Sequence, residues 1–277
     1  MTSRRFSQVD VFTTTAYAGN PVAVVLDAEG LETETMQRFA HWTNLSETTF
    51  LLPAQDPVAD YRLRIFTPAA ELPFAGHPTL GSCHAWLQAG GVPADPGTVV
   101  QECGTGLIQV RRADAGLAFA APPLLKSGPV DPELVAHVAN ALRIDQGAIV
   151  DTQWVDNGPG WLGVLLNSAD AVLDLRPGDL DLFIGVVGLY PAGSPNAAEV
   201  RAFFTVAGNT VEDPVTGSLN ASLAGWLIST GRVTAPYTAQ QGTVLGRRGR
   251  VHIEQDDNGT IWTGGGTVTC IHGHVDV

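Results

Sequence analysis

Residues 64–79 read RIFTPAAELPFAGHPT, and residues 202–218 read AFFTVAGNTVEDPVTGS. In both stretches a Phe-Thr pair ends an apolar run typical of a strand, a loop follows, and a Gly precedes a segment with the apolar spacing of a helix. The offset is 138 residues between Phe66 and Phe204 and 140 between Trp86 and Trp226, about half of the 277-residue chain. The two stretches therefore predict an internal repeat and two related domains.

The remaining pattern is that of a chain with many short strands and few helices. Apolar residues at helical spacing predict helices over 33–43, 78–89, 132–142 and 217–230. Short apolar and β-branched runs predict strands over 9–13, 22–26, 48–52, 62–66, 99–103, 107–111, 149–155, 161–166, 200–205, 251–254 and 268–272. The hydrophobic content of 44% is that of an ordinary globular protein, and the length favours two domains.

Charge and composition exclude several classes of partner. The formal net charge is −13, from 15 Lys and Arg against 28 Asp and Glu, which is the wrong sign for binding nucleic acid or an anionic membrane surface. No stretch approaches the roughly 18 apolar residues of a membrane span, and no secretory apolar region follows Met1. Cys83, Cys103 and Cys270 form no C-x-x-C pair, so we expect a reducing, cytoplasmic location.

Familiar motifs of cofactor and nucleophile chemistry are missing from the sequence. It contains no phosphate-binding loop ending in Lys, no G-x-G-x-x-G after a strand, no H-E-x-x-H and no G-x-S-x-G. We therefore expect neither a metal nor a nucleotide cofactor.

Ionisable and hydroxyl groups gather instead in a few short blocks. These blocks are 44–48, 64–68, 71–79 and 212–218, and residues 19–25 near the start of the chain belong with them. They resemble the PhzF-like family, which is named for a phenazine-biosynthesis isomerase and is related in fold to diaminopimelate epimerase. The resemblance extends from Val9 to about Gly266, with the blocks in family order.

The resemblance implies an α+β fold of two similar domains. Each is expected to be a curved, mostly antiparallel sheet wrapped around a central helix, with the active site in the cleft between the domains. We place the domains at 1–118 and 119–277, where the last strand can return to the N-terminal domain. The resemblance also implies a homodimer.

The resemblance further implies a cofactor-independent isomerase similar to trans-2,3-dihydro-3-hydroxyanthranilate isomerase, acting on a small carboxylate-bearing substrate. Carried over by position, Glu47 is the acid/base, and His77 and Asp213 are the other catalytic residues. The implied substrate-binding positions are Gly76, Gly217 and Ser218.

The residues themselves agree with such chemistry. Glu47 follows a helix end and begins an apolar strand, so we expect its carboxyl group to be partly desolvated, which favours the protonated form and suits proton transfer. Ser218 lies at the start of a helix, where backbone N–H groups attract a carboxylate. Taken singly, Asp213 and Ser218 can also be helix caps, and His77 a turn residue.

Two other functions stay open at this point. Related epimerases use two thiols as acid and base, and residues 103–106 (CGTG) superficially resemble such a motif, although they lie between two predicted strands. A non-catalytic protein that binds small molecules would keep the same fold. The acid Glu47 argues against that second function, because binding alone needs no proton-transferring group.

Overall fold

The computed structural model describes residues 2–206 and 208–277, which form two compact units. Unit 1 comprises residues 1–120 and 264–277, and unit 2 comprises residues 121–263. The chain passes from unit 2 back into unit 1 within β17 (Ile261–Gly265). Among the described residues, none of the helices has both the length and the apolar character needed to cross a membrane.

Unit 1 is a curved sheet around the helix α2 (Gly76–Gln88), with α1 (Thr33–Thr43) on its outer side. Its strands pair in the order β18, β1, β2, β3, β4, β6, β7, β8, with β5 beside β4. All neighbours are antiparallel except β2 with β3 and β4 with β6. The strand bounds are β1 (Ser3–Val11), β2 (Asn20–Val25), β3 (Glu47–Leu52), β4 (Tyr61–Phe66), β5 (Glu71–Leu72), β6 (Thr98–Cys103), β7 (Gly106–Ala113), β8 (Gly116–Ala120) and β18 (Thr267–Asp276).

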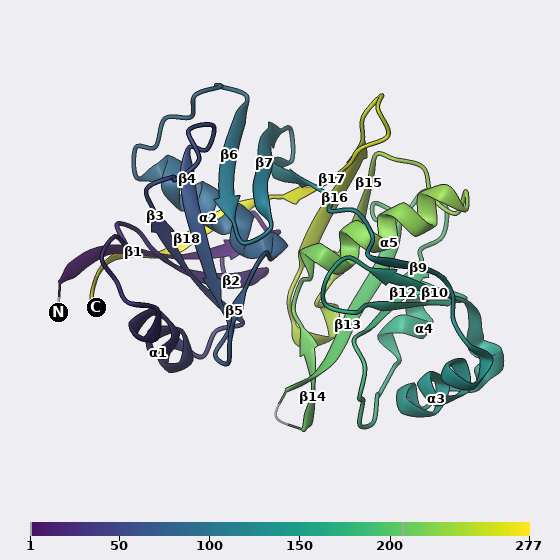
Figure 1. Cartoon of the computed structure of the whole chain (residues 1–277). Coiled ribbons are helices and arrows are strands. Elements are labelled where there is room, and N and C mark those ends of the chain that lie inside the picture. Colours follow the sequence, from purple (N-terminus) through teal and green to yellow (C-terminus); the bar gives the residue numbers. More distant parts are fainter. Residues whose placement is uncertain (1, 207) are drawn as a thin grey trace. The chain divides into compact units, whose positions relative to one another are not determined.

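The helix α2 lies inside the curve of this sheet, because it contacts β1, β2, β3, β4, β6, β8 and β18 (Figure 1). Gly81 permits the close approach: a Cβ at this position would lie 2.4 Å from a Val22 methyl carbon. On the opposite face of the sheet, α1 packs Met36 and Ala40 against Phe50 and other apolar side chains. Thus β3 separates an outer apolar layer from the central helix.

Unit 2 repeats this plan around the helix α5 (Gly217–Ser229). Its strands pair in the order β9, β10, β11, β12, β13, β15, β16, with β14 beside β13, and the parallel pairs are β11 with β12 and β13 with β15. The strand bounds are β9 (Lys126–Pro129), β10 (Ile149–Asp156), β11 (Leu162–Leu166), β12 (Ile184–Leu189), β13 (Ala198–Val206), β14 (Asn209–Asp213), β15 (Tyr237–Gln241) and β16 (Gly249–Gln255). The other helices are α3 (Pro132–Leu142), α4 (Ala169–Leu173), η1 (Gln146–Ala148) and η2 (Thr243–Leu245).

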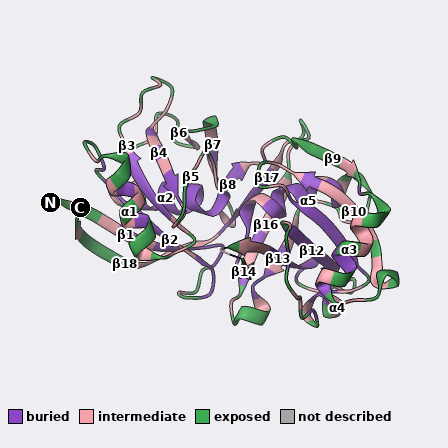
Figure 2. Cartoon of the chain, turned by 60° about the horizontal axis from the view of Figure 1, so that its bottom comes forward, coloured by how far each residue is buried: buried purple, intermediate pink, exposed green. Residues whose placement is uncertain are grey.

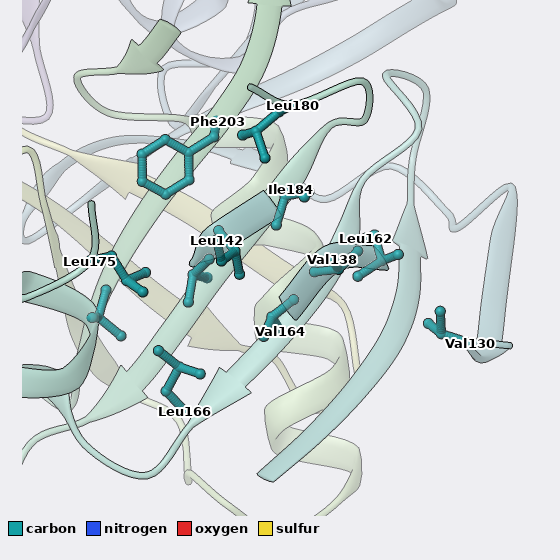
Figure 3. Packing of buried hydrophobic residues seen from close by; sticks show 12 residues of the cluster. Val130, Val138, Leu142, Leu162, Val164, Leu166, Leu175, Leu180, Ile184 and Phe203 are labelled. Carbon is teal, nitrogen blue, oxygen red and sulfur yellow. The ribbon is translucent and has the colours of Figure 1, made fainter. Parts of the chain in front are cut away.

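Side chains on β11 alternate between two layers, as the two-residue period of a strand requires. Leu162, Val164 and Leu166 belong to an apolar cluster that α3 and α4 cover (Figure 3). Gly163 faces α5 instead, where its Cβ would lie 3.0 Å from the Trp226 ring. Most of α5 is buried, in agreement with its place at the centre of the unit (Figure 2).

The two units are structural repeats, which confirms the expected fold class. Both central helices have 13 residues and begin at a Gly, Gly76 and Gly217, an offset of 141. In unit 1, α2 follows β5, which pairs with β4, and the strand after the helix, β6, is parallel to β4. In unit 2, α5 follows β14, which pairs with β13, and the strand after the helix, β15, is parallel to β13.

The strand registers correct the sequence alignment by one residue. Phe66 pairs with Glu71 across β4 and β5, and Phe203 pairs with Glu212 across β13 and β14. Phe66 therefore corresponds to Phe203, not to Phe204 as the sequence offset suggested. The adjacent Phe203 and Phe204 made either alignment possible from sequence.

Candidate active site

In unit 1, Glu47 and His77 lie side by side. The Nε2 atom of His77 lies 3.2 Å from Oε2 of Glu47, and the exposed fractions of the two side chains are 6% and 15%. Glu47 is the first residue of β3, and His77 is the second residue of α2. The strand and the central helix therefore bring together two of the residues named from the sequence.

Local structure explains why Glu47 points toward α2. The helix α1 ends at Thr43, and its C-cap Asn44 has the left-handed conformation (φ 55°) favourable for Asn, so the chain can turn into β3 within three residues. Along β3, the Thr49 side chain points to the side of α2, since its hydroxyl oxygen lies 2.8 Å from that of Ser82. Glu47 is two residues from Thr49 and shares its face of the strand.

Burial keeps His77 neutral. It lowers the pKa of His77 from 6.5 to about 3, against the smaller opposing effect of a backbone hydrogen bond with Pro21. On the other side of the ring, Nδ1 lies 3.4 Å from the amide nitrogen of Asn20. At neutral pH, Glu47 therefore faces an uncharged imidazole with one donor and one acceptor nitrogen.

The first turn of α2 adds backbone donors next to His77. Its internal hydrogen bonds start with the Thr79 N–H and the Ala75 carbonyl, so the N–H groups of Gly76 and His77 have no partner inside the helix. Ala75, at the N-cap, has no side chain that can cap them. Gly76 is buried at the first position of the helix.

In unit 2, Ser218 occupies the position of α5 that His77 occupies in α2. The indole Nε1 of Trp161 donates a hydrogen bond to Ser218 Oγ over 3.1 Å. Asn157 donates from its amide to the Ser218 carbonyl over 2.9 Å. Because an indole N–H cannot accept, the hydroxyl proton of Ser218 must point away from Trp161 and can serve another acceptor.

Asp213 is the last residue of β14 and is 9% exposed. The hydroxyl of Thr216 donates to its Oδ2 atom over 2.6 Å. The N-cap of α5 is Thr216, and its side chain makes no capping bond to the helix. Neither Asp213 nor Ser218 is therefore the N-cap of α5, and that alternative is wrong for both.

The residues named from the sequence thus fall into two groups. Gly76 joins Glu47 and His77 in unit 1, and Gly217 joins Asp213 and Ser218 in unit 2. The convergence of these two groups on one pocket stays a prediction.

Sequence reasoning gave no role to five residues that bond to these groups, namely Asn20, Asn157, Trp161, Thr216 and Gln241. Asn20 and Thr216 do lie in the blocks 19–25 and 212–218. One signal was available for Gln241: Gln101 and Gln241 stand 140 residues apart, at the offset of the repeat. Both are fully buried, which is rare for Gln and marks a bonded polar group.

A separate cavity of about 580 Å³ in unit 1 contains none of the named residues. Arg4, Arg5, Asp27, Glu29 and Trp86 are among those that line it. Charges of both signs meet there, so the lining indicates no class of ligand. Across residues 2–206 and 208–277, no three or more His, Cys, Asp or Glu side chains are grouped to hold a metal ion.

Comparison with known proteins places the whole chain in one family. The family model described as phenazine biosynthesis-like protein (PhzC-PhzF) matches residues 9–273. Antisense-enhancing sequence 1 of Schizosaccharomyces pombe is 36% identical over 99% of both chains. Trans-2,3-dihydro-3-hydroxyanthranilate isomerase of Pseudomonas aeruginosa is 34% identical over 92% of this chain and 91% of the relative. A crystal structure of a PhzF-family phenazine biosynthesis protein from Enterococcus faecalis covers 100% of both chains with a TM-score of 0.81 and 26% identity.

Proposed function

The chain belongs to the PhzC-PhzF family and is an isomerase, and from that premise we propose that it moves a proton on a small carboxylate-bearing substrate with Glu47 as the acid/base. The observation that carries this proposal is the 3.2 Å contact between Glu47 and a buried, neutral His77. A substrate similar to trans-2,3-dihydro-3-hydroxyanthranilate is proposed because the relative from Pseudomonas aeruginosa is named for it.

One carboxyl group is enough for such a reaction. The Glu47 carboxylate accepts a proton from one carbon, the electron pair of the broken C–H bond shifts through the unsaturated system, and the same carboxyl group returns the proton to another carbon on that face. Atoms and electrons balance without any co-reactant. General acid/base catalysis of this kind typically contributes 10²- to 10⁴-fold, so the group must lie against the substrate.

The neighbouring residues have distinct roles in this proposal. His77 donates a hydrogen bond to charge that develops on the substrate and, being neutral, does not lock Glu47 into an ion pair. The helix N-terminus at Gly217 and the Ser218 hydroxyl bind the substrate carboxylate. Asp213 holds a polar group of the substrate through its carboxylate.

Cys83 and Cys103 are poorly suited to a two-thiol mechanism. Burial raises the pKa of Cys83 to about 12, so its reactive thiolate form is scarce at neutral pH. Cys103 ends β6, and its sulfur lies 3.3 Å from the Thr105 hydroxyl within the β6–β7 turn, not ahead of a central helix. Alkylation of the native protein with iodoacetamide should leave the isomerase active, whereas a two-thiol enzyme would be inactivated.

Turnover of trans-2,3-dihydro-3-hydroxyanthranilate tests the proposal directly. We expect the wild type to convert it and Glu47→Gln to be at least about a hundredfold slower. Glu34→Gln, an exposed acid on α1, is the matched control and should keep wild-type activity. Equal rates for wild type and Glu47→Gln would refute the role of Glu47, and an inactive wild type would refute this substrate.

A further inference from the structure

The amide of Gln241 holds the loop between β14 and α5 with four hydrogen bonds. Gln241 ends β15 and is fully buried. Its Oε1 atom accepts from the Thr216 backbone N–H (3.0 Å) and from the Asn220 side-chain amide (2.8 Å). Its Nε2 atom donates to the Asp213 carbonyl (3.1 Å) and to the Thr216 hydroxyl (2.9 Å).

The direction of every bond in this network is fixed. A backbone N–H can only donate and a backbone carbonyl can only accept, so the Gln241 amide has one possible orientation. Its Nε2 then donates to the Thr216 hydroxyl oxygen. The single proton of that hydroxyl is left for Oδ2 of Asp213, 2.6 Å away. Asp213 must therefore receive this proton as an acceptor.

We propose that Thr216 and Gln241 are positioning residues that hold Asp213 as an oriented, hydrogen-bond-accepting carboxylate. The role rests on the proposed function, in which Asp213 contacts the substrate. The Thr216 bond occupies Oδ2 and sets the plane of the carboxylate. Neither Thr216 nor Gln241 needs to touch the substrate.

The hydrogen bonds from Gln241 to Thr216 and from Thr216 to Asp213 form what we call the relay. Unit 1 shows that the fold itself does not require it. Gln101 on β6 is the counterpart of Gln241, and it also bonds to the first turn of its central helix, through Thr79 Oγ1 at 3.0 Å. Its Oε1 atom accepts from the Tyr61 hydroxyl over 3.0 Å. The N-cap of α2 is Ala75, and the N-cap of α5 is Thr216. Ala75 has no hydroxyl group, so it cannot donate a hydrogen bond to a carboxylate as Thr216 does to Asp213. A buried Gln supports both helices, and the added Thr216 serves Asp213.

Substitutions at Thr216 separate this role from stability. Thr216→Val replaces the hydroxyl, with its bonds to Asp213 and Gln241, by a methyl group and keeps a β-branched side chain in an extended backbone conformation. Thr216→Ser keeps the hydroxyl and should restore the wild-type behaviour. Gln241→Met removes the donor to Thr216 but leaves several buried groups unbonded, so it is the harsher variant.

The matched control lies one residue away on the same strand. Gln240 points to the opposite side of β15, where it accepts from Asn196 over 2.7 Å and donates to Thr243 over 2.6 Å. Gln240→Met therefore also removes two side-chain hydrogen bonds from β15, but none of them leads to Asp213.

The test is the pH profile of kcat/KM for trans-2,3-dihydro-3-hydroxyanthranilate in these four variants. A lost hydrogen bond to a charged group corresponds to a decrease of about ten- to hundredfold, which we expect for Thr216→Val and Gln241→Met. Their acidic limb should move to higher pH, because an Asp213 carboxylate without its donor binds a proton more readily. Thr216→Ser and Gln240→Met should stay within about threefold of wild type. A Thr216→Val enzyme with wild-type kcat/KM and an unmoved acidic limb would overturn the proposal.

A second measurement needs no substrate and so distinguishes this proposal from the proposed function. The carboxyl ¹³C resonance of Asp213 can be followed against pH in full-length wild type, Thr216→Val and Thr216→Ser. We expect the titration midpoint of Asp213 to be higher in Thr216→Val than in wild type and to return in Thr216→Ser. Identical midpoints in all three proteins would refute the relay even if the wild type proves to be inactive on the named substrate.

Discussion

The Nε2 atom of His77 lies 3.2 Å from Oε2 of Glu47, and burial keeps that imidazole uncharged at neutral pH. Strand β3 supplies the carboxyl group and the first turn of α2 supplies the ring. In the proposed function, Glu47 is the group that transfers the proton, and His77 is its uncharged neighbour.

His77 makes the stability of the protein depend on pH. Its pKa is about 3 in the folded state and 6.5 without perturbation, so between these values the unfolded chain binds more protons. The free energy of unfolding should therefore fall as the pH drops from about 6.5 toward 3. Urea denaturation at several pH values should show a shallower fall in His77→Phe. His274→Phe, at an exposed imidazole of β18, should keep the wild-type slope.

Trp161 orients the Ser218 hydroxyl, and its loss should weaken substrate binding. Trp161→Phe keeps an aromatic ring against Phe183 and Phe204 but removes the N–H that donates to Ser218. A hydrogen bond of this kind contributes about 0.5–1.5 kcal/mol, so we expect KM to rise about two- to tenfold with kcat nearly unchanged. Trp262→Phe, which removes an indole bond to Asp256, is the control. An unchanged KM in Trp161→Phe would contradict this role.

The two repeats also carry matched Arg–Glu pairs of unequal burial. Arg201 binds both carboxylate oxygens of Glu212 with 4% of its side chain exposed, and Arg64 binds Glu71 in the same way with 18% exposed. Arg201→Met leaves a carboxylate that is only 12% exposed without its partner and should reduce the free energy of unfolding by about 3–5 kcal/mol. Arg64→Met should cost about 1 kcal/mol, since its partner is better solvated. If urea denaturation gave the same loss of unfolding free energy for Arg201→Met and Arg64→Met, the expected effect of burial would be contradicted.

Helix bounds were predictable where local signals are strong. The sequence predicted helices over 33–43 and 132–142, and α1 and α3 have these bounds. Asn44 ends the first in the left-handed conformation, and Asp131 caps the second through the Glu133 N–H. The start of α2 was predicted two residues late, at Pro78, so Gly76 and His77 were taken as loop residues when they form its first turn.

Strand β12 was not predicted, and tertiary packing explains why. Its sequence, IGVVGL, contains two glycines, which weaken a strand signal. A Cβ at Gly185 would lie 2.2 Å from a Leu219 methyl carbon, and one at Gly188 would lie 2.1 Å from the Ser168 carbonyl oxygen. These glycines are needed for the approach of α5 and of the chain before α4, a requirement that no local pattern reveals.

Among the candidate residues, those in recognisable blocks were named from the sequence, and their supporting partners were not. Glu47, His77, Asp213 and Ser218 belong to such blocks. Gln241 lies 28 residues beyond Asp213, and only the register between β15 and its neighbours brings its amide to Thr216. Hydrogen-bond networks of this kind depend on strand pairing, which a single sequence does not specify.

Solvent deuterium incorporation tests the role of Glu47 most directly. In D2O, wild-type protein with trans-2,3-dihydro-3-hydroxyanthranilate should place deuterium at the carbon that receives the proton, because the Glu47 carboxyl group exchanges with solvent between turnovers. We expect Glu47→Gln to bind the substrate but to incorporate at least about a hundredfold less deuterium, with Glu34→Gln equal to wild type. Incorporation by Glu47→Gln at the wild-type rate would contradict the account.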